Sequence, residues 1–333
     1  MKRYLPILTN GISLVALSGV ILLAAHLRLS NVTNNPGWFA DEGSNLDVAY
    51  HLRQGQLQYM ALGQSTLMVS RLVLFEGLLA TLLTCFGGGI TTLRILSGVL
   101  GIGSVLMLYL CAQRLTRKTW LALLSALLLA IYPQAILYSR FGFSYNLLPL
   151  LVLPAYIGLW EYMQRNQRGW LMLAAVLIGL GTISDIWMLA LIAPFGLIVL
   201  LQRWRDLLWS VPLVLLPFCL YIAFLWSQAP QAMMTDLRFV LFRVSNVTLL
   251  GQLQNVAMNY TVLLSQDFWM PCAIIGFLLL RPIPLRQLTL VVFFLTLVVL
   301  GRTIALYSLR ARKSIISPAK FELSMGASNS GFR

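Results

Sequence analysis

Two adjacent carboxylates, Asp41 and Glu42, are the residues of this sequence best suited to chemistry. They lie in the segment Trp38–Gly43, beside aromatic side chains and shortly after a long apolar stretch. One carboxylate of such a pair can act as a general base while the other orients it, and two together can coordinate a divalent cation. The alternative is a solvated turn or an acid pair at a helix N-terminus. Only His26 and His51 occur in the chain, so a histidine-based metal site is not expected.

A second group of polar residues lies between Tyr138 and Asn146, in a turn that separates two apolar stretches. Arg140 is placed where the phosphate of a lipid head group would lie. A guanidinium binds phosphate through two parallel hydrogen bonds and keeps its charge at every relevant pH. Arg94, at the start of an earlier apolar stretch, raises the same expectation. The alternative for both arginines is a side chain that only extends from the apolar region to the water interface.

Asp185 is a single acid at the end of another apolar stretch, in the segment Gly181–Trp187. An isolated carboxylate there needs a partner or water, because charge is costly near the hydrocarbon region of a membrane. It either pairs with an arginine of the same face or lines the cavity of a site.

The elements that must position these residues follow from an apolar composition. Of 333 residues, 59% are hydrophobic and only 10% are charged, and the mean hydropathy is +0.82. Soluble domains have about 25% charged residues, so a soluble globular protein, a disordered chain, a collagen-like fibre and a disulfide scaffold are excluded. The composition predicts an all-α, polytopic transmembrane helix bundle. The four scattered cysteines are typical of small buried apolar side chains.

The bundle is expected to contain about eight to nine spans. The first runs from about residue 4 to 27 behind Lys2 and Arg3, which predicts an uncleaved signal anchor. A first outer loop covers 28–90 and a second covers 227–266. The further candidate spans are 91–112, 119–137, 144–162, 170–186, 187–201, 207–226, 267–280 and 288–306. The transmembrane domain thus covers 1–306, followed by a basic tail over 307–333 that is predicted to be disordered.

The first outer loop is expected to hold short helices at the membrane surface. Ser44, with Asp47 three residues later, is typical of a helix start. The apolar segment 64–86 also carries charged residues, so we expect it to lie flat at the interface rather than to cross it. The run Gly87-Gly88-Gly89 predicts its end.

The positions of the charges give the bundle an orientation. The chain has 24 Lys and Arg against 10 Asp and Glu, a net charge of +14. With the N-terminus inside, 11 basic residues fall in short inner links and 7 on the longer outer segments, whereas only Glu161 and Asp206 among the acids fall inside. Basic residues accumulate in cytoplasmic loops, so the excess reflects topology and no nucleic-acid partner is expected. The N-terminus is therefore predicted to be cytoplasmic and the acid pair extracytoplasmic.

These pieces, in this order, resemble the GT-C superfamily of membrane glycosyltransferases, of the protein-mannosyltransferase, aminoarabinose-transferase and lipopolysaccharide-core sugar transferase type. That family opens with one span, an outer loop carrying Asp-Glu, and interfacial helices. The motifs that carry the resemblance are Asp41-Glu42-Gly43, Leu93-Arg94-Ile95-Leu96-Ser97, Tyr109-Leu110-Cys111-Ala112-Gln113-Arg114-Leu115, Tyr132-Pro133, and Tyr138-Ser139-Arg140 with Asn146. The resemblance covers about residues 1–226.

The resemblance implies an inverting hexosyl- or pentosyltransferase of the plasma (inner) membrane, multi-pass, with its active site on the extracytoplasmic face. Its implied partners are a polyprenyl-phosphate-linked sugar donor and a lipid, glycan or protein acceptor. It implies Asp41 as the general base and Glu42 as the residue that orients the acceptor or supports Asp41. Arg140, with Arg94, would hold the carrier phosphate. No firm cofactor is expected, and a divalent metal at the acid pair stays an alternative.

Tyr138, Asn146 and Asp185 complete the candidate substrate-binding residues. Two other functions stay open: a transporter or flippase, and a non-catalytic, truncated transferase fragment. Transporters often contain two related halves and broken helices near the membrane centre. This sequence shows no repeat, and its charges cluster at the outer rim. The six basic residues from Arg302 onward, which topology does not explain, favour the fragment.

Overall fold

A computed structural model of the chain describes residues 5–56, 58–59, 65–66, 73–245 and 254. The chain divides into two compact units, Met1–Leu237 and Arg238–Arg333, and the description below concerns the first. The predicted spans 267–280 and 288–306 and the predicted tail 307–333 lie outside the described residues.

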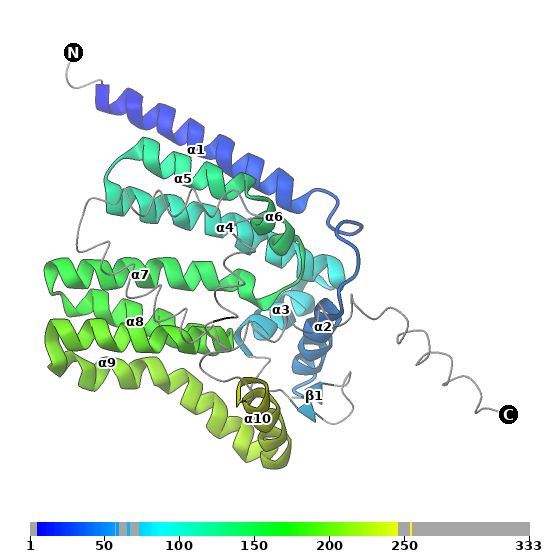
Figure 1. Cartoon of the computed structure of the whole chain (residues 1–333). Coiled ribbons are helices and arrows are strands. Elements are labelled where there is room, and N and C mark those ends of the chain that lie inside the picture. The colour runs from blue at the N-terminus through cyan, green and yellow to red at the C-terminus, as the bar shows by residue number, and fades with distance from the viewer. Residues whose placement is uncertain (1–4, 57, 60–64, 67–72, 246–253, 255–333) are drawn as a thin grey trace. The chain divides into compact units, whose positions relative to one another are not determined.

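Long apolar helices make up most of the first unit, in the order that the sequence predicts. Those that run side by side are α1 (Leu5–Leu29), α4 (Ile90–Thr116), α5 (Thr119–Ile131), α7 (Leu148–Arg165), α8 (Arg168–Thr182) and α9 (Ile192–Gln228). Figure 1 shows them aligned, in the spatial order α1, α5, α4, α7, α8 and α9. The all-α, polytopic class is therefore confirmed.

Several of these helices meet the requirements of a membrane span. Within the described residues, the ones long and apolar enough are Gly11–Leu29, Ile90–Thr116 and Met188–Gln228. A fourth is added if α5 and α6 (Pro133–Arg140), which meet at a bend of 58°, count as one span. Large apolar side chains such as Leu22, Leu201 and Leu208 stand exposed on the outside of the helices. Lipid, unlike water, is a favourable surrounding for such faces. The protein is a multi-pass membrane protein.

Helix α9 reverses direction at Arg203, where φ of −163° and ψ of 95° interrupt the helical backbone. A straight helix over the 41 residues Met188–Gln228 would be about 60 Å long, twice the thickness of the hydrocarbon core. The break lets the second part return beside the first (Figure 1). It falls in the link that the charge pattern predicts between the spans 187–201 and 207–226.

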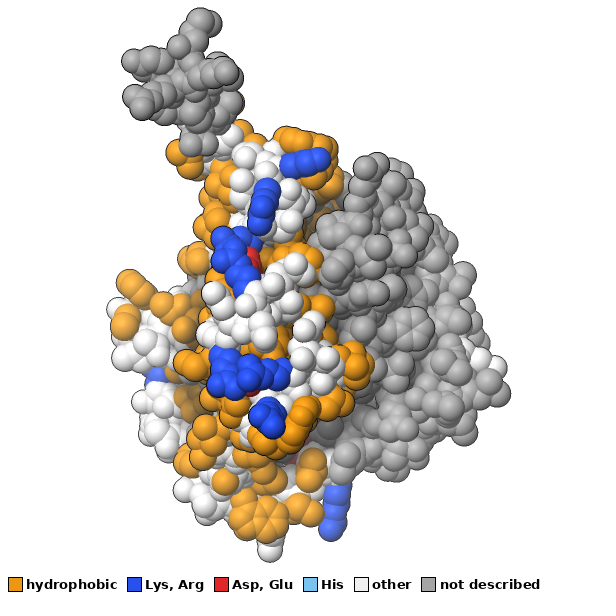
Figure 2. Space-filling model, turned by 90° about the vertical axis from the view of Figure 1, so that its left-hand side faces the viewer, with side chains coloured by type: hydrophobic (Ala, Val, Ile, Leu, Met, Phe, Trp, Pro, Cys, Tyr) orange, Lys and Arg blue, Asp and Glu red, His pale blue; other side chains and the backbone are white. Residues whose placement is uncertain are grey.

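Two tight helix ends lie at the same end of the bundle as this break. Arg117 and Asn166 adopt left-handed backbone conformations, with φ of 55° and 52°. Their amides donate to the carbonyls of Gln113 and Tyr162, which closes α4 and α7 within one residue. The basic links are thereby gathered on one face, where Figure 2 shows a band of Lys and Arg side chains.

The bend between α5 and α6 lies at the opposite end. Pro133 has no N–H group, so the carbonyl of Leu129 lacks its usual helical partner. Arg28 donates to the oxygens of Leu129 and Ala130, at 3.0 and 2.9 Å. The side chain of Arg28 is buried, and it ties the end of α1 to the last turn of α5.

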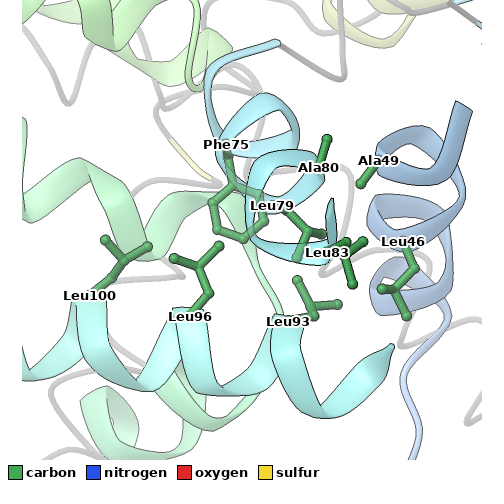
Figure 3. Close-up of a cluster of buried hydrophobic side chains, with 9 residues drawn as sticks. All are labelled: Leu46, Ala49, Phe75, Leu79, Ala80, Leu83, Leu93, Leu96 and Leu100. Atoms are coloured by element: carbon green, nitrogen blue, oxygen red, sulfur yellow. The ribbon is translucent and has the colours of Figure 1, made fainter. Parts of the chain in front are cut away.

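Helices α2 (Ala40–Arg53) and α3 (Val73–Phe86) pack against the start of α4 at this end (Figure 3). They share one buried apolar cluster: Leu46, Ala49, Phe75, Leu79, Ala80, Leu83, Leu93, Leu96 and Leu100. Burying each large member contributes about 1.5–3 kcal/mol, which holds α2 in place. The 14 residues of α3 extend about 21 Å, shorter than a membrane span, and Gly87 and Gly88, with positive φ, end the helix where the sequence predicts.

Both segments that the sequence assigns to outer loops contain further elements. Among the described residues of the segment 64–86, Ser65–Thr66 form β2, which pairs antiparallel with β1 (Gln58–Tyr59), and Val73–Phe86 form α3. The predicted second outer loop contains a helix, α10 (Pro230–Ser245), which starts with a proline at its first position, where the missing N–H costs nothing.

Candidate active site

The acid pair lies in the first turn of α2. The helix begins at Ala40, four residues before the Ser44 start that the sequence predicts. The reason is Glu42, whose Oε2 accepts a hydrogen bond from the backbone N–H of Phe39 at 3.3 Å and so closes the N-terminus. Asp41 is half-buried in the same turn. Acidic side chains are favourable in the first turn of a helix, where the partial positive charge of the N-terminus lies.

Glu42 and Arg94 form a buried, two-pronged ion pair. The Nε and Nη2 atoms of Arg94 lie 2.7 and 2.8 Å from Oε1 and Oε2 of Glu42. Both side chains are almost fully shielded from solvent. Parallel N–H···O bonds of this kind are the strongest pairing between two side chains. They join the start of α2 to the start of α4.

The remaining N–H groups of Arg94 hold the loop that precedes α2. Its Nη1 atom donates to the carbonyls of Val32 and Pro36, at 2.8 and 2.9 Å, and Nη2 donates to that of Gly37 at 2.9 Å. A guanidinium has five N–H groups, and all five are thus engaged within the protein. Arg94 therefore has no donor left for a phosphate in this conformation, and it acts here as a positioning residue.

Glu42 also connects the acid pair to the turn that carries Arg140. Its Oε1 accepts a hydrogen bond from the backbone N–H of Gly142 at 3.0 Å, and Asn45 donates to the carbonyl of Gly142 at 2.7 Å. A side chain at position 142 would meet Leu93, so only glycine fits. Asp41 and Arg140 therefore lie on either side of one short connection.

Arg140 differs from Arg94 in both surroundings and charge balance. It donates to the carbonyls of Leu27, Ser30 and Asn35, at 2.8, 2.6 and 2.9 Å. Neutral carbonyls leave its charge uncompensated, and none of the ion pairs between described residues includes it. The side chain is partly exposed. Of the two predicted phosphate-binding arginines, Arg140 is the one that still offers positive charge toward the outside.

The other predicted residues fall near this turn or next to it. Asn146, in a short 3-10 turn (η2, Ser144–Leu147), donates to the carbonyls of Tyr138 and Phe141 at 3.0 and 3.1 Å, which fixes the turn around Arg140. Asp185 follows the end of α8, half-buried, where its amide caps the helix by donating to the carbonyl of Gly181. It precedes a second 3-10 segment, η3 (Ile186–Leu191).

Aromatic rings form a continuous cluster around the same turn. The ring centroids of successive contacts are 4.8 to 6.0 Å apart, the distances of favourable aromatic pairs, among Phe39, Tyr138, Phe141, Phe143 and Tyr145. Tyr138 and Phe39 are 47% and 44% exposed, so two rings at the edge of the cluster face outward. Phe39 immediately precedes the first turn of α2 and brings the cluster to the acid pair.

A divalent cation at the acid pair would have to displace Arg94 from both oxygens of Glu42. Among the residues that the structure describes, no three His, Cys, Asp or Glu side chains come together.

Two residues that complete the site, Asn45 and Gly142, carry no sequence signal of their own, because their roles rest on a hydrogen bond between segments 97 residues apart.

These features define a multi-pass membrane protein with a polar site built on surface helices at one end of its bundle. Residues 73–228 match the model of the family described as dolichyl-phosphate-mannose-protein mannosyltransferase. The fold is similar to that of a structure of the S. cerevisiae protein O-mannosyltransferase Pmt1-Pmt2 complex bound to the sugar donor, with a TM-score of 0.52 and 17% identity. Both findings confirm the resemblance to the GT-C superfamily of membrane glycosyltransferases.

The extent of these matches differs along the chain. The structural match covers 66% of this chain and 34% of the yeast chain, so this protein spans about a third of the length of that relative. The family match includes Arg94 and Arg140 and begins after the acid pair. Comparison with the curated proteins finds no significant match.

Proposed function

We propose that this chain is a membrane glycosyltransferase that moves a sugar from a polyprenyl-phosphate carrier to a hydroxyl or amine acceptor at the extracytoplasmic membrane face. The observation that carries the proposal is the connection of Glu42 to both Arg94 and the amide of Gly142. It places a half-buried carboxylate, Asp41, next to the turn that holds an uncompensated guanidinium, Arg140. A base and a phosphate-binding cation are the two groups that this transfer requires.

In the proposed reaction, Asp41 removes the proton of the acceptor as its oxygen or nitrogen attacks the anomeric carbon. The bond between that carbon and the phosphate oxygen breaks, and the carrier phosphate leaves with the electron pair. Attack from the face opposite to the leaving group inverts the anomeric centre. The first turn of α2 stabilises the carboxylate before the reaction, and Glu42 holds the turn in place.

Arg140 is proposed to hold the phosphate of the carrier. Negative charge grows on that phosphate in the transition state, and a fixed guanidinium directed at it lowers the barrier. Four hydrogen bonds to backbone carbonyls hold the guanidinium in position without neutralising it. Arg94 contributes indirectly, by positioning Glu42.

The aromatic cluster is proposed to contact the donor or acceptor beside this pair. Tyr138, exposed at the edge of the cluster, offers an apolar ring face and a hydroxyl group. Asn146 keeps the turn closed, and Asp185 is a candidate contact at the neighbouring end of α8. By likeness to the matched family, we propose mannose as the sugar and a dolichyl-type polyprenyl phosphate as the carrier.

The experiment is transfer of radiolabelled sugar from a polyprenyl-phosphate donor by purified protein in detergent. We expect Asp41→Asn, which keeps size and hydrogen bonding but removes the base, to lower the rate about 10²–10⁴-fold. The matched control is Asp47→Asn, an acid of the same helix whose Oδ1 lies 3.7 Å from Nδ1 of His51. This control should retain the wild-type rate.

Arg140 is tested by donor titration. Arg140→Lys keeps a positive charge but loses the hydrogen bonds that fix the guanidinium in position, so we expect a higher KM for the donor and a lower kcat. Transfer that is unchanged in Asp41→Asn would refute the assignment of the base. Transfer by Asp41→Asn that recovers at higher donor concentration would instead place Asp41 in donor binding.

A further inference from the structure

A pocket of about 540 Å³ lies at the other end of the bundle, away from Asp41 and Arg140. Its lining residues come from the last turns of α4 and α7: Leu110, Gln113, Arg114, Leu115, Arg117, Trp160, Glu161, Gln164 and Arg165. Arg94 and Arg114 are 20 residues apart on α4, which corresponds to about 30 Å, the thickness of the hydrocarbon core. The pocket therefore opens at the face that the charge pattern predicts to be cytoplasmic.

The rim of this pocket carries a fixed excess of positive charge. One buried carboxylate, Glu161, pairs with two guanidinium groups: Nε of Arg114 lies 2.6 Å from Oε1, and Nε of Arg165 lies 2.6 Å from Oε2. Arg117 adds a third charge, and no acid among the described residues pairs with it. Three cations against one anion leave about two positive charges around the opening.

The same contacts leave free donors on two residues that line the pocket. Arg114 and Arg165 each pair through Nε, and their terminal Nη groups have no hydrogen-bond partner among the described residues. Their side chains are 45% and 48% exposed. Arg114 is further held over the ring of Trp170, 5.7 Å from its centroid. The two guanidinium groups are thus oriented before any ligand binds.

The lower part of the pocket is apolar. Leu110 is 49% exposed on α4, about two turns before Arg117. Leu115 and Trp160 line the same space. A ligand that fits must carry a negative charge at the membrane surface and an apolar part that extends into the bilayer. Among the common components of a membrane, anionic phospholipids have this shape, and basic pockets between spanning helices bind their head groups.

We propose that this pocket binds the phosphate of an anionic phospholipid from the leaflet at this face. The terminal N–H groups of Arg114 and Arg165 would donate to the phosphate oxygens, and Arg117 would add charge at the opening. The acyl chains would lie along Leu110 and Trp160. This site is separate from the proposed active site and does not depend on the proposed function.

Native mass spectrometry of the purified full chain tests the proposal. The protein is incubated in detergent with an equimolar mixture of phosphatidylglycerol and phosphatidylcholine that have the same acyl chains. We expect wild type to retain phosphatidylglycerol preferentially. Each arginine removed should weaken this binding about fivefold, so Arg117→Gln/Arg165→Gln should lose about 25-fold.

Two further variants separate a site from diffuse surface charge. Arg205→Gln removes an exposed arginine near the same links, outside the pocket, and should change binding less than twofold. Glu161→Gln removes the negative charge that pairs with Arg114 and Arg165, so it should strengthen phosphatidylglycerol binding about fivefold. Equal losses in Arg205→Gln and in the pocket variant would overturn the proposal.

Two other outcomes would also overturn it. Wild type that shows no preference for phosphatidylglycerol has no anionic lipid site here. Displacement of the lipid by glycerol 3-phosphate at equal concentration would show a site for a soluble phosphate compound, since the acyl chains would then contribute nothing.

Discussion

The arginine side chains at the end of the bundle that carries the candidate site differ in whether their positive charge is neutralised by an acid. Arg28 and Arg140 donate to backbone carbonyls, and among the described residues neither pairs with an acid. Arg94 shares its charge with Glu42 and is saturated by the preceding loop. Arg28 is buried, whereas Arg140 is partly exposed. This comparison singles out Arg140 as the residue available to an anionic substrate.

At the residue scale, we predict that loss of the Glu42–Arg94 ion pair destabilises the fold strongly. Arg94→Met leaves the buried Glu42 carboxylate without its counter-charge, which should lower the free energy of unfolding by about 3–5 kcal/mol. Denaturant unfolding in mixed micelles measures it. Arg165→Met, in a pair half-exposed to water, should cost about 1 kcal/mol or less.

The double variant Glu42→Gln/Arg94→Met provides a second check. Because it removes both charges, it should lose less than the sum of the two single variants. Equal unfolding midpoints for Arg94→Met and wild type would contradict the structural role of this pair.

At the element scale, Asp206 joins three helices. Its buried carboxylate accepts hydrogen bonds from Tyr162 of α7 at 3.0 Å, Arg168 of α8 at 3.0 Å and Trp209 of α9 at 3.3 Å. Burial alone would raise the pKa of Asp206, but these donors outweigh it and hold the pKa below its usual range. The acid lies in the link between the two parts of α9, outside the spans.

The sign of the resulting pH dependence follows from that shift. A carboxyl group with a depressed pKa stabilises the fold fully above its unfolded pKa of about 4, and the contribution is lost as pH falls below that value. We predict that Asp206→Asn is less stable than wild type at pH 7 and that the difference shrinks below about pH 4. Thermal unfolding across this range measures it. A difference that is constant with pH would contradict the prediction, and Asp47→Asn, at a partly buried position of α2, serves as a control.

At the scale of the whole molecule, the first unit has two ends that differ in their chemistry. One end carries the basic links, where Figure 2 shows a band of Lys and Arg side chains, and the proposed lipid pocket. The other end carries the acid pair, Arg140 and the aromatic cluster. Basic links are retained in the cytoplasm. The proposed transfer would then occur on the opposite, extracytoplasmic face.

This orientation can be tested by thiol labelling of single cysteines, introduced into a variant that lacks the four native cysteines. Thr33→Cys, in the exposed loop before α2, should react with a membrane-impermeant thiol reagent in intact cells. Lys118→Cys, between α4 and α5, should react only after permeabilisation. The reverse labelling pattern would contradict the assignment of the faces. Labelling of both cysteines in intact cells would indicate leaky membranes, and a cytoplasmic marker protein controls for such leakage.

The sequence by itself determined the membrane class, the order of the helices before residue 228 and the sorting of charge between the ends. These features depend on local runs of apolar residues and on the excess of Lys and Arg in the short links, and both can be read directly from the sequence. The break at Arg203 shows this, since it falls in the predicted basic link. The start of α2 was placed too late, because its capping residue, Glu42, is defined by contacts that the local pattern does not reveal.

Only the tertiary structure decided how the candidate residues divide their roles. In the sequence, Arg94 and Arg140 looked alike, as arginines at the outer ends of apolar stretches. Packing placed Arg94 against a carboxylate 52 residues away and Arg140 against neutral carbonyls more than 100 residues away. The charge that an arginine can offer to a substrate depends on its partners, and partners so distant in the chain are set by the fold.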